Sequence, residues 1–375
     1  CSAEDADSEG HEGLFYLWSA DEFKKTVQDK YSESLAKYWN VTPQGNFEGK
    51  NILNVSQSIK VFGEQLGLEE NEWQKIIKYA RRNLQDVRAQ RIRPLKDDKI
   101  LVSWNALMIS SFAQAARILE RNEYGITAYN ALAFIEEHLI NQEGRLLRRY
   151  RDGDAKFPAY LCDYAQLGLA CLDIYAWNYE PQYVLKAHHW ANEINRLFLN
   201  PDGAYFETGF DAEEVLVRKA DGYDGVEPSG NTSTALLFLK LASFGMGSGF
   251  LRDAERILHS FSPHLHQAGV NFSAMLNALI WARKGGTEIV VSGAESNLET
   301  QQVLQWLRQS FLPEVVIAFI PSDDPDPVSQ QIPIAEGRAS LDERLLVHVC
   351  QGQLCHAPVH DLPSLKNLIG KILNN

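Results

Sequence analysis

Apolar positions form two kinds of helical pattern in the middle of the chain. In one kind, apolar residues recur every three or four positions on a single stripe, and this pattern covers residues 71–91, 126–139 and 183–197. In the other kind, apolar or small residues surround nearly the whole helix, and this pattern covers residues 100–119, 161–177 and 232–244. Striped helices are typical of partly exposed positions, and helices apolar all round are typical of buried ones. The sequence therefore predicts an inner layer of buried helices inside an outer layer of striped ones.

Polar motifs lie at the starts of the three predicted inner helices. These are Trp104-Asn105, Asp163-Tyr164 and Ser229-Gly230-Asn231, which recur at a spacing of about 60 residues. Such a long period indicates a repeated helical hairpin, and a ring of inner helices inside outer ones is the natural arrangement. Because helix N-termini present unpaired N–H groups and a positive dipole end, anions and hydroxyl groups are favoured there. We expect a pocket to open at this end of the ring.

Shorter segments predict strands around and after the helices. Two β-hairpins are expected before inner helices, at residues 144–150 and 203–208, where Gly or Asp-Gly supplies the turn signal. After residue 285 the sequence predicts a small α/β part, with strands at 287–291, 314–320 and 344–350 and helices at 298–311 and 364–373. We therefore expect two domains, a helical barrel at residues 1–285 and an α/β subdomain at residues 286–375.

Composition and charge narrow the class of protein. The chain has 375 residues, of which 45% are hydrophobic and 23% charged, so it has material for a large core and for an enzyme. A net charge of -13 disfavours nucleic acid and anionic lipid as partners, since both require clustered Lys and Arg. The sequence has no apolar run long enough to span a bilayer and no signal-peptide pattern at its start. We expect a soluble, cytoplasmic protein.

An acidic stretch next to aromatic residues opens the chain. It includes Asp5, Asp7 and Glu9, and it runs into Phe15-Tyr16-Leu17-Trp18. Carboxyl groups beside aromatic rings suit an acid–base site in a sugar-binding cleft. The spacing also resembles part of a calcium-binding EF-hand loop, although Tyr16 stands where the bidentate Glu is required. A third interpretation is a solvated acidic loop.

The five cysteines do not predict a disulfide framework. They are scattered, and their odd number is more typical of a reducing compartment. Cys350 and Cys355 form a C-x4-C pair with His356 and His360 nearby, but this spacing matches no common zinc finger. We expect buried or unreactive thiols, and we expect no metal ion and no cofactor.

Several long motifs, spread over almost the whole chain, resemble one family. The residues that carry the resemblance are Ser2 to Gly10 with Phe15 to Trp18, Arg93-Pro94 through Ile100, Trp104-Asn105, Asp163-Tyr164-Ala165, Asp224-Gly225 with Pro228 to Asn231, and Val349-Cys350 through Cys355. With these motifs the chain resembles the C-terminal part of the YyaL-type thioredoxin-domain-containing proteins, a family with a spermatogenesis-associated member in animals.

The resemblance implies a fold more firmly than an activity. The family is similar to a thioredoxin-like domain followed by an (α/α)6 toroid of the six-hairpin glycosidase and sugar-epimerase kind. The match begins inside the barrel, so the thioredoxin-like domain and about four leading helices have no counterpart here. We count eight long helices between residues 71 and 283. The fold class is therefore expected to be mainly α, a barrel incomplete at its N-terminus with a small α/β subdomain. Either the missing part of the family's chain or self-association is expected to complete the barrel.

A carbohydrate-active barrel is the leading hypothesis for function. Hydrolysis of a glycosidic bond needs one carboxylic acid to protonate the leaving oxygen and one carboxylate to activate water. The candidate acid–base residues are Asp7, Asp98, Asp163 and Glu227. The candidate sugar-binding residues are the rings of Tyr16, Trp104 and Tyr164 and the polar side chains of Asn105, Asp224 and Asn231. The alternatives are that Asp163 only caps its helix and that Trp104 belongs to the core.

Two other hypotheses compete with hydrolysis. A sugar epimerase of the N-acylglucosamine 2-epimerase kind would use bases that move a proton beside a carbonyl, a task usually performed by His. None of the ten histidines lies at the start of a predicted inner helix, and only His11 lies within a motif. The second alternative is a sugar-binding or regulatory scaffold without turnover.

Overall fold

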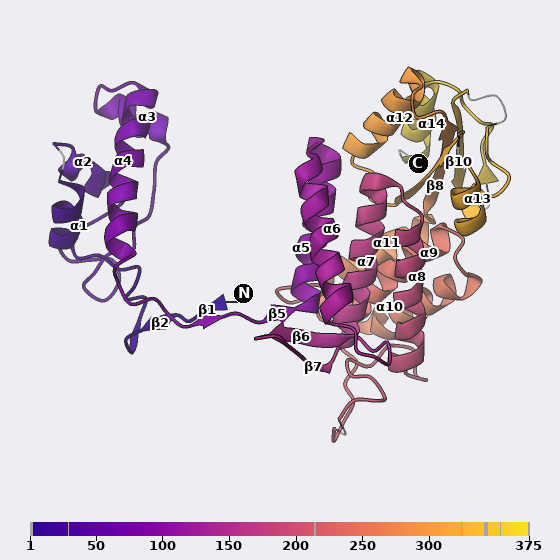
Figure 1. Cartoon of the computed structure of the whole chain (residues 1–375), viewed down its shortest axis with the longest axis horizontal. Coiled ribbons are helices and arrows are strands. Elements are labelled where there is room, and N and C mark those ends of the chain that lie inside the picture. The colour runs from indigo at the N-terminus through magenta and orange to yellow at the C-terminus, as the bar shows by residue number, and fades with distance from the viewer. Residues whose placement is uncertain are drawn as a thin grey trace. The chain divides into compact units, whose positions relative to one another are not determined.

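The computed structural model describes residues 3–28, 30–213, 215–323, 325–340, 344–352 and 354–373. The chain divides into two compact units, residues 1–99 and residues 100–375 (Figure 1). The boundary expected at residue 285 lies inside the second unit, between the last of its long helices and the first strand of its α/β part. A barrel domain spanning residues 1–285 therefore stays a prediction.

The first unit is built on an aromatic core. Its helices are α1 (Ala20–Val27), α2 (Ser32–Tyr38), α3 (Ile59–Gln65) and α4 (Glu70–Arg88). Trp73 of α4 is fully buried and stacks on Phe62 of α3, with ring centroids 5.6 Å apart. Arg91 donates to the carbonyl oxygens of Phe15 and Leu17 at 2.6 and 2.9 Å, which fastens the opening segment of the chain to the end of α4. Large aromatic side chains thus give a short chain segment a core of its own.

The acidic stretch of the first unit forms a hairpin. The short strands of this region are β1 (Ala3–Glu4), β2 (Asp7–Ser8), β3 (His11–Glu12) and β4 (Lys96–Asp97), and β2 pairs with β3 while β1 pairs with β4. Glu9 and Gly10 form the turn with φ of 54° and 79°, the left-handed backbone that tight two-residue hairpin turns require. An EF-hand loop lies between two helices, so this strand–turn–strand geometry does not fit the calcium interpretation.

The second unit contains two layers of helices (Figure 1). Its long helices are α5 (Val102–Leu119), α6 (Asn122–His138), α7 (Leu161–Asn178), α8 (Gln182–Phe198), α9 (Gly230–Ser243), α10 (Ser248–Ala268) and α11 (Ser273–Lys284), with the 3-10 turn η1 (Gly269–Phe272) between the last two. Along one layer α5 packs against α7, α7 against α9, and α9 against α11. In the other layer α6, α8 and α10 each pack against the inner helix that precedes them. The predicted alternation of inner and outer helices, and with it a mainly α fold, is confirmed.

Burial separates the two layers as predicted, with one exception. The α7 and α9 helices are buried on nearly every side, whereas α6 and α8 each show an exposed stripe. The prediction of burial on every side is wrong for α5, where Trp104, Met108 and Leu119 are 44%, 53% and 59% exposed. Within the second unit α5 has an inner neighbour, α7, on one flank only, so part of its apolar surface stays open. Residues 71–91 form α4 in the first unit, so their predicted place in the outer layer stays a prediction.

One of the two predicted hairpins forms. The strands β6 (Leu147–Arg151) and β7 (Asp154–Pro158) make the hairpin expected from residues 144–150, and β5 (Ile100–Leu101) extends it to three strands. The hairpin expected at residues 203–208 is wrong, because among the described residues Tyr205 makes only an isolated bridge with Leu199. The Asn231 side chain bonds both the N–H and the carbonyl oxygen of Tyr205, at 2.8 and 2.9 Å. These backbone groups are therefore not free to pair along a second strand.

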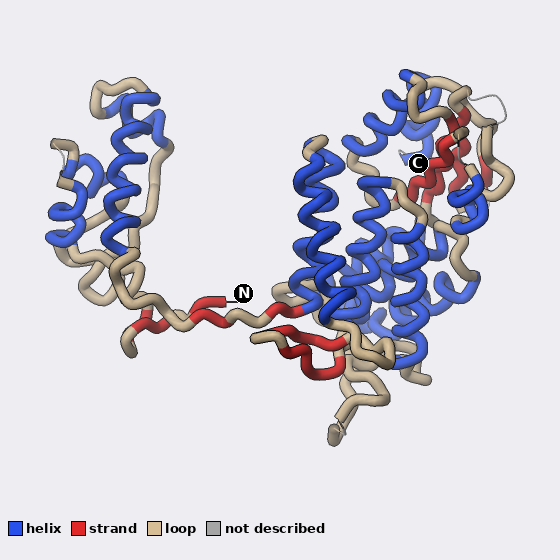
Figure 2. Tube along the Cα trace, viewed as in Figure 1, coloured by secondary structure: helices blue, strands red, loops and turns tan. Residues whose placement is uncertain are grey.

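The α/β part agrees with the sequence. Its elements are β8 (Thr287–Gly293), α12 (Leu298–Gln309), β9 (Val315–Pro321), α13 (Asp326–Gln331), η2 (Pro333–Ala335), β10 (Leu346–Gln351), β11 (Leu354–Cys355) and α14 (Leu362–Leu373). The strand order is β11-β10-β8-β9, with β8 and β9 parallel around the α12 crossover and β10 antiparallel to β8. Figure 2 shows this sheet and the β6–β7 hairpin at opposite ends of the helices of the second unit.

The C-x4-C pair corrects the expectation of free thiols. Cys350 and Cys355 lie opposite each other in the β10–β11 pairing, and their sulfurs form a disulfide across a Cα–Cα distance of 4.1 Å. A bonded sulfur is not a thiolate ligand, so this pair does not support a zinc site. Cys162 and Cys171 are free. Among the described residues, no helix combines the length and the apolar character needed to cross a membrane.

Close packing between α6 and α7 yields a test of the fold. A Cβ atom added to Gly125 of α6 would lie 2.2 Å from the Trp177 ring of α7. We expect Gly125→Ala to destabilise the protein by about 1–3 kcal/mol, because overpacking outweighs the better helix propensity of Ala. Gly370→Ala in α14, which meets nothing within 4 Å, is the control and is expected to be neutral or stabilising. Chemical denaturation measures both, and equal stability of the two variants would contradict this packing.

Candidate functional site

A buried carboxylate joins the starts of two inner helices to the hairpin. Asp163 in the first turn of α7 is fully buried and accepts hydrogen bonds from the backbone N–H groups of Ser103 at 3.0 Å and Tyr160 at 2.9 Å. Arg148 of β6 donates to the same carboxylate at 2.9 Å and forms an ion pair with it. Asp163 therefore caps its own helix, as one sequence interpretation proposed, and also holds α5 and β6 against α7.

Arg148 is the cation around which the acidic groups of this region gather. Its guanidinium lies over the Tyr160 ring, 4.4 Å from the centroid, and interacts electrostatically with Asp163, Glu207 and Glu227. Burial alone would lower the pKa of Arg148, but the neighbouring anions raise it above the usual value. Burial raises the pKa of Asp163, while Arg148 and the backbone donors act in the opposite direction. One permanent positive charge is thus shared by three carboxyl groups.

Glu207 is the residue of this cluster that sequence reasoning missed. It lies in the segment between α8 and α9, its backbone N–H donates to the carbonyl oxygen of Lys219 at 2.8 Å, and its carboxylate accepts from the backbone of Asp221. Its Oε1 atom is buried without a hydrogen-bond partner. Burial and the nearby Asp221 charge raise the pKa of Glu207 to about 7. No pattern in the sequence marks this residue, because its environment comes from segments distant along the chain.

Two further carboxyl groups differ from Glu207 in their surroundings. Burial raises the pKa of Glu227, which accepts a hydrogen bond from the Trp104 indole at the start of α5. Burial would also raise the pKa of Asp221, but the Lys219 ammonium and the backbone N–H of Tyr223 lower it below the usual value. Glu207, whose pKa is raised, therefore lies near Asp221, whose pKa is lowered. Such a pair of a protonated and an ionised carboxyl group is the condition for acid–base catalysis.

The predicted site residues fall into both units. Asp163, Glu227 and Trp104 lie together in the second unit, which brings half of the predicted acid–base set into one cluster. Asp7 and Asp98 are exposed residues of the first unit, so the convergence of all four carboxyl groups stays a prediction. Tyr16, also in the first unit, is 42% exposed and donates to Glu4 at 3.0 Å.

The remaining predicted binding residues support the fold in this structure. The Tyr164 ring is fully buried against Trp190 and Phe198, so it offers no surface to a sugar. Asn231 is fully buried and its amide is occupied by backbone groups, as described above.

Asp224 and Asn105 are also engaged with the backbone. One carboxylate oxygen of Asp224 accepts from the N–H groups of Ala274 and Met275 at 3.0 Å each, which caps the start of α11. Asn105 donates to the carbonyl oxygen of Leu101 at 2.8 Å. Within the described part of the chain, no three His, Cys, Asp or Glu side chains are arranged to hold a metal ion.

Comparisons with curated proteins establish a homologue. The chain is 25% identical to spermatogenesis-associated protein 20 of Homo sapiens over 404 residues, covering 98% of this chain and 51% of that protein. It is 26% identical to the Mus musculus protein of the same name, and 26% identical to an uncharacterised protein of Caenorhabditis elegans, of which it covers 54%. The chain is thus a homologue of spermatogenesis-associated protein 20, as the motifs predicted, and it spans about half the length of these relatives. No protein-family model matches it.

Solved structures similar to the chain include sugar-modifying enzymes. They include cellobiose 2-epimerase from Bacillus thermoamylovorans, with 17% identity and a TM-score of 0.37 over 45% of this chain and 46% of that one. The α-1,6-mannanase GH76A of Salegentibacter has 11% identity and a TM-score of 0.37 over 65% and 70% of the two chains. D-mannose isomerase has 13% identity and a TM-score of 0.38 over 68% and 70%. Because these TM-scores are below 0.5, no conclusion about this chain rests on them.

The raised pKa of Glu207 predicts how stability depends on pH. Between the usual carboxyl value of 4.5 and about 7, the folded chain keeps a proton on Glu207 that the unfolded chain releases. Stability should therefore fall as pH rises through this range, by on the order of 2–3 kcal/mol from this group. Glu207→Gln should remove that contribution, whereas Glu255→Gln, on an exposed position of α10, should keep it. Urea denaturation at pH 5 and pH 8 measures the difference, and identical pH dependence in all three proteins would contradict the assignment.

The bonds of Asp163 predict that removing its charge destabilises the protein. Asparagine would leave Arg148 without its buried counter-ion, and breaking such a pair costs about 3 kcal/mol. We expect Asp163→Asn to lower the melting temperature by roughly 5–10 °C. Asp154→Asn breaks an exposed ion pair with Lys156 on the same hairpin and should change it little. Calorimetry compares the two, and an unchanged melting temperature for Asp163→Asn would show that the pair is dispensable.

Proposed function

We propose that the chain acts on carbohydrate and hydrolyses a glycosidic bond with a pair of carboxyl groups. The observation that supports this best is Glu207, whose carboxyl group has a pKa of about 7 and lies in one cluster with Glu227, Asp163 and Arg148. A buried carboxyl group held near neutral pKa is suited to donating a proton, and such groups are concentrated at functional sites. The same activity is proposed for the longer relatives, of which the chain spans about half.

Each residue of the cluster has a distinct role in this mechanism. Glu207 in its protonated form donates to the oxygen of the leaving sugar, which avoids expelling a strongly basic alkoxide. Glu227, beside the exposed Trp104 ring, activates the attacking water or forms the bond to the sugar carbon. Trp104 supplies a flat apolar surface for a sugar face. Asp163 acts as a positioning residue, because it fixes the guanidinium of Arg148 that both glutamates face.

Two observations favour hydrolysis over the alternatives. An epimerase needs bases that remove a proton next to a carbonyl, and in the described structure no His is among the main electrostatic neighbours of Glu207, Glu227 or Asp163. A scaffold that only binds sugar has no use for a carboxyl group of raised pKa, whereas an acid catalyst requires one.

A cytoplasmic location is also part of the proposal, although a disulfide such as Cys350–Cys355 is more common in oxidising compartments.

The assignment of Glu207 as the acid can be tested by the choice of leaving group. Glu207→Gln should reduce the hydrolysis of an unactivated disaccharide by about 10²- to 10⁴-fold, because the leaving oxygen needs a proton. A 4-nitrophenyl glycoside leaves without protonation, so the same variant should lose much less activity on it. In the unsubstituted protein, kcat/KM for the disaccharide should fall above about pH 7 as Glu207 loses its proton.

Controls separate this mechanism from its rivals. Glu227→Gln should impair both substrates, and the exposed Glu255→Gln should impair neither. Full activity of Glu207→Gln on a disaccharide that the unsubstituted chain hydrolyses would refute the acid role. Incorporation of solvent deuterium at a sugar carbon without hydrolysis would instead identify an epimerase.

A further inference from the structure

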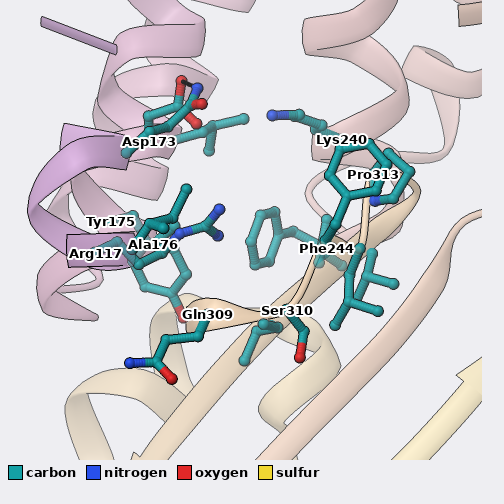
Figure 3. A pocket seen from close by; sticks show the side chains of 17 residues that line it. Arg117, Asp173, Tyr175, Ala176, Lys240, Phe244, Gln309, Ser310 and Pro313 are labelled. Atoms are coloured by element: carbon teal, nitrogen blue, oxygen red, sulfur yellow. Dashed lines mark hydrogen bonds between the residues drawn. The ribbon is translucent and has the colours of Figure 1, made fainter. Parts of the chain in front are cut away.

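A second polar site lies at the other end of the inner helices. A cavity of about 450 Å³ opens between the C-terminal halves of α5, α7 and α9 and the segment that joins α12 to β9. Figure 3 shows Arg117 and Asp173 on one side of this cavity and Lys240 and Phe244 on the other. Asp173 stands ten residues after Asp163 on α7, which places the cavity about 15 Å from the acidic cluster. The two sites are therefore separate.

The charged residues that line this cavity are rare on the helices that carry them. Arg117 is the one charged residue of α5 and Lys240 is the one charged residue of α9. On α7 the charged residues are Asp163 and Asp173. Three neighbouring helices that are otherwise apolar or uncharged thus direct one charged side chain each, Arg117, Asp173 and Lys240, to a single cavity.

The two cations have no anionic partner within the described residues. The Nε atom of Arg117 is buried without a hydrogen bond, and Lys240 forms no ion pair in the described part of the chain. Within the described residues one oxygen of the Asp173 carboxylate has a hydrogen-bond partner, the Gln114 amide, which donates to it at 3.2 Å. In a chain with a net charge of -13, two unpaired cations facing one cavity form a local anion-attracting site.

A purely structural explanation accounts for part of this arrangement. Basic residues in the last turns of helices are favoured by the helix dipole, which suits Arg117 and Lys240. The dipole does not explain Asp173, since a carboxylate in the second half of a helix is not favoured by it. It also does not explain why the buried Nε of Arg117 is left without a partner, which costs free energy.

We propose that this cavity binds a small hydroxylated anion, a sugar or polyol that carries a phosphate or carboxylate group. The anionic group lies between Arg117 and Lys240, where charge-assisted hydrogen bonds to both are available. The Asp173 carboxylate accepts hydrogen bonds from the hydroxyl groups of the ligand, and the Gln114 amide donates to them. The Phe244 ring and the segment around Pro313 cover the apolar face of the ligand. The site is independent of the acid–base cluster and would bind such an anion whether or not the chain hydrolyses glycosides.

Titration calorimetry on the full chain tests this site with three probes. Glucose 6-phosphate and gluconate carry the two possible anionic groups, and glucose carries neither. We expect at least one of the two anions to bind at least about tenfold more tightly than glucose, and the tighter of the two identifies the preferred group. If neither anion binds more tightly than glucose, the proposal is overturned.

Variants show whether the binding occurs in this cavity. Arg117→Met and Lys240→Met should each weaken the preferred anion by about tenfold or more, and the exposed Lys284→Met of α11 should not. Asp173→Asn should weaken the sugar anion but not inorganic phosphate, because the carboxylate contacts hydroxyl groups only. Thermal melts without ligand establish that each variant is folded. Unchanged affinity in a folded Arg117→Met or Lys240→Met variant would locate the binding elsewhere and overturn the proposal.

Discussion

The carboxylate of Asp163 is the constraint on which the arrangement of the second unit depends. A charge removed completely from water is costly unless it is paired and hydrogen-bonded, and Asp163 meets this requirement with partners from three segments. The N–H of Ser103 comes from α5, the N–H of Tyr160 from the start of α7, and the guanidinium of Arg148 from the hairpin. If these segments separated, the fully buried Asp163 carboxylate would lose the partners that compensate its charge.

This constraint also shapes the chemistry of the neighbouring carboxyl groups. Arg148 is committed to Asp163, so it neutralises the other acids only in part, and burial keeps the pKa of Glu207 near neutral. If positive charge compensated every carboxyl group of the cluster, their pKa values would be close to those of exposed carboxyl groups. The acid–base potential of Glu207 and Glu227 thus results from a structural ion pair that takes most of the available positive charge.

Polar groups are placed at the two ends of the inner helices, and the apolar core lies between them. At one end lies the acidic cluster around Arg148, and at the other end lies the cavity with Arg117 and Lys240. The middle turns of α7 and α9 bury their apolar side chains against neighbouring helices, which holds both ends in place. The exposed apolar stripe of α5, with Trp104 and Met108, shows that this inner layer has an open flank within the second unit.

The sequence alone determined the inner and outer helices of the second unit, the strands of the α/β part, and that inner helices start with polar motifs, because periodicity and turn residues act over a few positions. It also placed Asp163, Glu227 and Trp104 at one end of the helices. Only the tertiary structure decided that Glu207 joins them, that Asp163 is fully bonded, and that Cys350 meets its partner across a turn. Burial, pairing and pKa depend on groups that are separated in the chain, by 15 residues for Arg148 and Asp163 and by 60 for Ser103 and Asp163. A pattern of neighbouring residues carries no information about such distant partners, and folding brings them together.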